Sequence, residues 1–222
     1  MNLSIYFEDP RFSEKQYQDL IIQELHCRHQ QYLLKQENFL QTFPNVLNAM
    51  DLPSCDGVNT WFISKYAKMQ GLKAVLSGIG GDELFGGYPS FKRMQAAGLL
   101  QHLPDPAMKM GQQTSSRELS RMAYLQLPGI KGLYLFLRGP FTPNEIARQL
   151  DMDEKQVWRQ LESTPLFMDL HQLHPKNKAS WMEFNLYMQN QLLRDADVMS
   201  MAHGLEIRVP FLDHDLVKAA FS

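Results

Sequence analysis

The sequence predicts an α/β fold: a parallel, doubly wound sheet in about the first 95 residues, followed by a mainly helical second half. Two observations support this. Short apolar runs alternate with segments of helical periodicity up to about Met94, and beyond it strand signals stop while prolines punctuate the chain. We therefore expect residues 1–95 to form an α/β part and residues 96–222 to form a mainly helical part of the same domain.

The expected elements follow from these patterns in chain order. Apolar runs closed by turn residues predict three strands, at 3–7, 31–34 and 72–76. Apolar residues at helical spacing predict three helices, at 13–25, 37–50 and 61–69, with a turn at 56–59 before the last of them. A further helix is expected to start near Asp82, after a run of glycines.

Composition narrows the possible functions. The chain has 222 residues, a formal net charge of −2 and two cysteines. No block of Lys and Arg is present that would attract nucleic acid or an anionic membrane, and no apolar stretch approaches the length of a membrane span. We therefore expect a cytoplasmic protein with small-molecule or protein partners, and two reduced thiols rather than a disulfide.

The most informative motif runs from Ser77 to Tyr88, with the sequence SGIGGDELFGGY. A strand ends at Ser77, glycines follow, and a helix begins near Asp82. Ligands of open α/β sheets lie at the carboxyl ends of strands, where glycine lets backbone N–H groups approach an anion. An acidic side chain beside phosphate suggests an intervening Mg²⁺ held by Asp82. The alternative is a tight turn at Gly80-Gly81 with Asp82 capping the helix.

A second motif, near the end of the chain, carries charged residues within an apolar run. Asp197 precedes SMAHGLEIRVPFLD, which contains Glu206 and Arg208. Residues two apart suit an extended strand or a turn, so Glu206 and Arg208 are expected to reach separate partners. Such charges are either functional or part of a structural ion-pair network. If functional, all three are expected beside the cleft at Ser77.

Both motifs resemble those of the glutamine-dependent asparagine synthetases. The first is similar to the family pattern SGxGxDExFGGY, and the second to DxxSMxxxxExRxPFLD, in the same order and with similar separation. The resemblance implies a synthetase domain with a sheet of the adenine-nucleotide α-hydrolase type, in which residues 1–95 bind the nucleotide. It also implies an ATP- and Mg²⁺-dependent ligase that adenylates the aspartate side chain, after which ammonia derived from glutamine displaces AMP.

The resemblance also assigns roles to individual residues. It implies nucleotide contacts at four positions: Ile5 near the adenine, and Ser77, Gly78 and Gly80 in the turn. It implies catalytic roles for Asp82, which would hold Mg²⁺, and for three residues on the acyl-acceptor side, namely Asp197, Glu206 and Arg208.

The sequence departs from the family pattern in several places. The family's pyrophosphate loop, SGGxDS, has no counterpart here and would belong before Leu3. The glutaminase domain with its N-terminal cysteine nucleophile is also absent, and the family's catalytic lysine would lie beyond Ser222. We therefore expect a fragment, cut short at both ends, that is inactive by itself. Its expected partners are the glutaminase domain of the full-length protein and, through an exposed sheet edge, a second copy in a homodimer.

Ile79 bears on the substrate, because many asparagine synthetases carry an acidic residue at this position of the motif. Because of this difference, a second interpretation remains: the chain belongs to a related amidotransferase that acts on another carboxylate. Because the pyrophosphate loop is missing, a third interpretation also remains: the chain is a non-catalytic nucleotide-binding or scaffold module.

Overall fold

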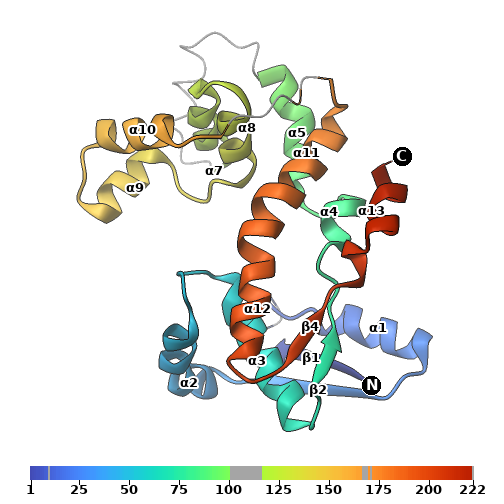
Figure 1. The fold of residues 1–222 in the computed structure, drawn as a ribbon. Helices are drawn as coiled ribbons and strands as arrows, with labels where there is room; N and C mark the ends of the chain where they lie inside the picture. Colours follow the sequence, from blue (N-terminus) through green and yellow to red (C-terminus); the bar gives the residue numbers. More distant parts are fainter. Residues whose placement is uncertain (10, 101–116, 167–169, 171, 222) are drawn as a thin grey trace. The chain divides into compact units, whose positions relative to one another are not determined.

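A computed structural model describes the chain except for residues 10, 101–116, 167–169, 171 and 222. The described residues divide into two compact units. One comprises residues 1–80 and 185–219, and the other residues 81–184 with the last residues of the chain. The sheets lie in the first unit, and the second consists of helices (Figure 1).

The first unit begins with a strand–helix–strand crossover. Strand β1 (Asn2–Phe7) is followed by helix α1 (Lys15–Leu25) and strand β2 (His29–Leu34). The two strands pair in parallel, from Asn2 opposite His29 to Phe7 opposite Leu34. The alternation seen in the sequence therefore gives the parallel unit that it predicts.

Two helices and the end of β2 form the core of this unit. Helix α2 (Gln36–Ala49) and helix α3 (Asp56–Met69) pack with helix α12 (Leu193–Met201) from the end of the chain. The buried residues at their centre are apolar: Leu34, Val46, Trp61, Phe62 and Met199. The core therefore joins segments from both ends of the sequence.

Helix α3 begins earlier than expected, because residues 56–59 form its first turn and not a separate turn. Ser54 provides the reason: its Oγ accepts hydrogen bonds from the backbone N–H groups of Asp56 and Gly57 at 3.1 and 3.4 Å. The carboxylate of Asp56 also lies in the first turn, where the helix dipole favours negative charge.

Strand β3 (Ala74–Leu76) pairs in parallel with strand β4 (Glu206–Arg208), and the two lie side by side in Figure 1. The late part of the chain thus contains a strand as well as helices. A continuous doubly wound sheet is not confirmed. The described residues form two separate two-stranded parallel sheets, β1–β2 and β3–β4.

The second unit is helical. It contains the short helix α4 (Gly81–Phe85) and then α5 (Pro89–Leu100), α7 (Arg117–Ser120), a 3₁₀ helix at Arg121–Gln126, α8 (Gly129–Arg138), α9 (Pro143–Leu150), α10 (Glu154–Ser163) and α11 (Pro175–Met182). Its buried residues include Tyr124, Phe136 and Leu137. Helix α9 starts with a reciprocal capping box between Thr142 and Glu145.

The chain returns to the first unit through an unusual helix. Residues Glu183–Leu192 form a π-helix that follows α11 directly and leads into α12. A 3₁₀ turn (Pro210–Leu212) and helix α13 (His214–Phe221) follow β4. No helix in the described part of the chain is both long and apolar enough to cross a membrane.

Candidate functional site

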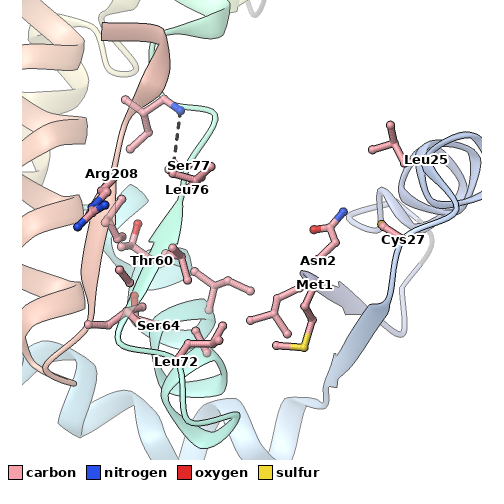
Figure 2. A pocket seen from close by; sticks show the side chains of 18 residues that line it. Met1, Asn2, Leu25, Cys27, Thr60, Ser64, Leu72, Leu76, Ser77 and Arg208 are labelled. Atoms are coloured by element: carbon pink, nitrogen blue, oxygen red, sulfur yellow. Dashed lines mark hydrogen bonds between the residues drawn. The ribbon is translucent and has the colours of Figure 1, made fainter. Parts of the chain in front are cut away.

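The turn after β3 carries the first motif and is held by β4. The Ser77 N–H donates a hydrogen bond of 2.8 Å to the Arg208 carbonyl oxygen, which continues the β3–β4 pairing by one residue. The Ser77 Oγ accepts from the Ile79 N–H at 3.3 Å, the dashed line of Figure 2. The start of the turn is therefore held by hydrogen bonds from residues of both motifs: Ser77 and Ile79 in the first and Arg208 in the second.

Two glycines in this turn have different surroundings, and the absence of a side chain matters at each for a different reason. Gly80 is buried with a φ of +100°, and a Cβ there would lie 2.7 Å from the Leu212 side chain and 3.0 Å from Phe211 Cβ. A side chain at this position would disturb the packing of the turn on the segment after β4. Gly78, in contrast, is exposed, and a Cβ there would meet nothing within 4 Å. Its backbone is therefore open to a ligand.

A pocket of about 890 Å³ lies beside this turn in the first unit. Ser77, Ile79 and Arg208 line it, together with residues of β1 and α3 (Figure 2). Ile5, which was expected to contact a nucleotide, is not among the lining residues and packs against the buried core around Phe62.

Asp82 follows the turn directly and lies in the first turn of α4, in the second unit. Its side chain is exposed and has no hydrogen-bond or ion-pair partner within the described residues. A Cβ on Gly87 would come within 1.9 Å of Asp82 Oδ1, so the second glycine of the GGY segment leaves room for this carboxylate. An exposed carboxylate without an internal partner is suited to a cation.

This contact predicts that Gly87→Ala acts through Asp82. The added methyl group would displace the end of a flexible side chain, which costs little stability but moves the carboxylate. In the full-length polypeptide we expect the Mg²⁺ concentration for half-maximal activity to rise about tenfold or more, with Tm nearly unchanged. Magnesium titration of activity and a thermal melt measure the two effects. An unchanged Mg²⁺ requirement would contradict the proposed link to Asp82.

The two charged residues of β4 do not have the separate partners that were expected. Glu206 and Arg208 pair with each other, with Arg208 Nε 2.9 Å from Glu206 Oε1. Both side chains are exposed, at 59% and 64%. The hydrogen bond that Arg208 donates to the Glu206 carboxylate raises the pKa of the Arg208 guanidinium. Because they occupy alternate positions of one strand, their side chains share a face, and the expectation of separate partners is wrong.

The three residues expected near the Ser77 cleft are only partly brought together. The backbone of Arg208 accepts from Ser77, and Arg208 lines the pocket. Glu206 lies at the opposite end of β4, and Asp197 is exposed on α12; neither lines the pocket. Arg208 is therefore the member of this set that the structure places beside the turn.

Sequence reasoning missed a buried carboxylate on α12. Asp195 is 4% exposed and accepts a hydrogen bond from the Ser54 hydroxyl, and burial raises the pKa of this carboxyl group. Nearby, the Asp56 carboxylate accepts from Tyr187 at 2.7 Å and from Gln191 at 2.5 Å. These bonds tie the start of α3 to the π-helix and the loop before α3 to α12. No pattern in the sequence indicates that Asp195, and not Asp197, faces inward.

Within the described residues, no group of three or more His, Cys, Asp or Glu side chains could hold a metal ion by itself. Mg²⁺ in nucleotide sites characteristically uses only one or two carboxylates and takes its other ligands from phosphate and water. The single free carboxylate of Asp82 fits that mode and does not fit an all-protein metal cage.

The environment of the His203 ring predicts that the stability of the first unit depends on pH. Its ring packs edge-on against Trp61, and burial, followed by the charge of Lys65, lowers its pKa below the usual 6.5. Protonation of His203 is therefore easier in the unfolded chain than in the folded one. The contribution of neutral His203 to the free energy of unfolding should be fully present above about pH 6.5 and should be lost as pH falls through the folded-state pKa. Thermal melts at several pH values should show a smaller acid loss for His203→Phe. Equal losses in both proteins would contradict this assignment.

Comparison with known proteins gives matches over nearly the whole chain. The family model described as asparagine synthase matches residues 2–222. Asparagine synthetase [glutamine-hydrolyzing] 1 of Bacillus subtilis is 27% identical over 95% of the chain, and a putative asparagine synthetase of Mycobacterium bovis is 25% identical over 96%. In both cases the match covers 34% of the relative, so the chain spans about a third of their length.

A second group of relatives has a different printed name. The amidase chry2 of Gibberella zeae is 28% identical over 75% of the chain, and the match covers 28% of that protein. No solved structure matches the chain.

Proposed function

Because the chain belongs to the asparagine synthase family, we propose that it is the central part of an ATP-dependent amide-forming synthetase. In the proposed reaction, the complete enzyme adenylates the side-chain carboxylate of aspartate, and ammonia released from glutamine displaces AMP. The observation that carries this proposal is the family match across residues 2–222, which includes both motifs. It is supported by the open glycine turn beside Arg208.

The residues present fit a nucleotide with its magnesium ion. The exposed backbone at Gly78 would face phosphate, and Arg208 is among the residues that line the pocket together with Ser77. Asp82 would hold Mg²⁺, which supplies neutralisation of phosphate charge when it is bound. The contribution of this chain is thus to bind and orient an anion at the carboxyl end of β3.

ATP–pyrophosphate exchange on the full-length polypeptide tests the proposal. We expect exchange that requires Mg²⁺ and a carboxylate substrate, with aspartate active in a panel of carboxylates, and amide formation on addition of ammonia. Exchange with no dependence on any carboxylate in the panel would contradict adenylation. The same assay on residues 1–222 alone should give no measurable turnover, because no glycine-rich pyrophosphate loop is present in these residues.

A related amidotransferase on another carboxylate is the second candidate, and Ile79 is the observation that favours it. This apolar side chain lines the pocket beside Ser77, at the motif position where many asparagine synthetases carry an acidic residue. Relatives named amidases, chry2 of Gibberella zeae and chyE of Penicillium rubens, also match part of the chain, so its relatives do not all carry the name asparagine synthetase. In the carboxylate panel, this candidate predicts exchange with a substrate other than aspartate.

A further inference from the structure

We propose that Arg138, at the end of helix α8, is a positioning residue for the carboxylate of Asp82. It acts through Tyr88, which ends the first motif and directly follows the glycine that lies against Asp82. Because Asp82 is the proposed magnesium ligand, this role of Arg138 rests on the proposed function. All residues that carry it belong to the helical unit.

The segment that contains Asp82 folds back on itself. The Asp82 carbonyl oxygen accepts hydrogen bonds from the N–H groups of Gly86 and Gly87, at 2.9 and 3.0 Å. The Asp82 side chain also lies against the second of these glycines, because a Cβ on Gly87 would come within 1.9 Å of Asp82 Oδ1. The place of the carboxylate therefore depends on where the backbone of Gly87 lies.

Tyr88 holds that backbone, because it follows Gly87 directly. Its hydroxyl donates to Glu83 Oε1 at 2.9 Å, and Glu83 is only 1% exposed. The Glu83 carbonyl oxygen in turn accepts from the Ser180 hydroxyl on α11 at 2.5 Å. The residues that follow Asp82 and Gly87 are thus joined to each other by one hydrogen bond, and α11 holds the first of them.

Arg138 packs on the ring of Tyr88. Its guanidinium carbon lies 4.4 Å from the ring centre, within the range of a cation–π contact. Its Nε donates to Glu183 Oε2 at 2.7 Å, and the Glu183 side chain is only 1% exposed. Because a buried charge pair is little screened by solvent, Glu183 holds the guanidinium firmly over the ring. The pair therefore fixes Tyr88 relative to α8.

The alternative is an ion pair that only stabilises the helical unit. Both roles predict a loss of stability when Arg138 is replaced, but they differ in the affinity for metal. Groups that orient a metal ligand without touching the metal change its affinity by roughly 10- to 100-fold when they are replaced. A positioning role therefore predicts weaker metal binding even in a variant whose stability has been restored.

Binding of the metal–nucleotide complex, measured without turnover, tests the proposal. The probe is Mn²⁺, which takes the same oxygen ligands as Mg²⁺ and whose EPR signal reports binding. It is titrated with ATP into the full-length polypeptide in the absence of a carboxylate substrate. We expect Arg138→Met to raise the dissociation constant about tenfold. In an Asp82→Asn background, where the positioned carboxylate is absent, Arg138→Met should add less than about twofold.

Glu183→Gln separates positioning from stability. The double variant Arg138→Met with Glu183→Gln has no uncompensated buried charge, so its Tm should return toward that of the natural protein. Its dissociation constant for Mn²⁺–ATP should stay raised about tenfold, because the guanidinium over the Tyr88 ring is still missing. Arg138→Lys keeps a cation for Glu183 and for the ring, so it should weaken binding less than Arg138→Met.

Thr142→Ala is the matched control for stability. It removes the capping box at the start of α9, in the same unit and outside both motifs. We expect it to lower Tm by several degrees and to leave the dissociation constant for Mn²⁺–ATP unchanged. A rise in the dissociation constant of this control equal to that of Arg138→Met would show that any loss of stability weakens binding, and would overturn the positioning role.

Three further results would overturn the proposal: an unchanged dissociation constant in Arg138→Met, full recovery of metal affinity together with Tm in the double variant, or equal effects of Arg138→Met with and without the Asp82 carboxylate. A natural protein that did not bind Mn²⁺–ATP would overturn it as well. The expected pattern of dissociation constants without pyrophosphate exchange on any carboxylate would support the role of Arg138 and contradict the proposed reaction.

Discussion

Asp82→Asn is expected to reduce carboxylate-dependent ATP–pyrophosphate exchange by the full-length polypeptide at least about a hundredfold. The physical reason is the environment of this carboxylate, which is exposed and has no partner within the described residues. Asparagine keeps its shape but removes the charge that would hold a cation against phosphate. Raising the Mg²⁺ concentration should recover part of the lost exchange, since a weakened metal site can still be filled.

Two variants make this expectation specific. Asp151→Asn removes another exposed carboxylate, at the end of α9 and outside both motifs, and should leave exchange unchanged. Asp82→Glu keeps the charge and should retain more activity than Asp82→Asn. If Asp82→Asn kept activity within about threefold of the natural protein, Asp82 would not be the magnesium ligand.

Much of the first unit could be predicted from local patterns. The strands at 3–7 and 31–34 and the helices at 13–25 and 37–50 appear within a few residues of their expected ends. The first helix forms as its periodicity predicts, although its apolar residues Tyr17, Leu20 and Ile21 are exposed. The start of α3 was missed because the decisive feature is a hydrogen bond from its first turn to Ser54. A side chain outside the periodic segment provides that bond, so periodicity alone does not locate the helix start.

Pairing between distant segments was less predictable. Strand β4 has only three residues, and its exposed Glu206 and Arg208 flank the partly buried Ile207. So short a segment has little periodicity to detect, and it becomes a strand because β3 lies beside it. The resemblance placed this segment near Ser77, but the strand itself depends on tertiary contacts.

The sequence also did not predict which charged residues near the later motif are buried. Asp195 and Asp197 are two residues apart on α12, so they point about 200° apart around the helix axis. They therefore lie on different faces of the helix, and the surrounding apolar residues do not indicate which of the two is buried. The structure shows Asp195 buried against Ser54 and Asp197 exposed. The family role of Asp197 stays a prediction.

The helical unit contains an ion pair that no motif indicated. Arg138, at the end of α8, pairs with Glu183 at 2.7 Å, and the glutamate side chain is only 1% exposed. The guanidinium of Arg138 also lies 4.4 Å from the centre of the Tyr88 ring, whose hydroxyl donates to Glu83 at 2.9 Å. The first motif is therefore connected to α8 and to the start of the π-helix through one cation.

Arg138→Met is expected to lower the free energy of unfolding by about 3–5 kcal/mol. The methionine would fill similar space but leave the carboxylate of Glu183 buried without its cation, and that uncompensated charge is the main cost. Urea denaturation followed by circular dichroism measures the change. The double variant Arg138→Met with Glu183→Gln removes both charges, so it should recover a large part of the loss. If the double variant were as unstable as Arg138→Met alone, the loss would come from the packing of Arg138 on Tyr88 and not from the buried charge.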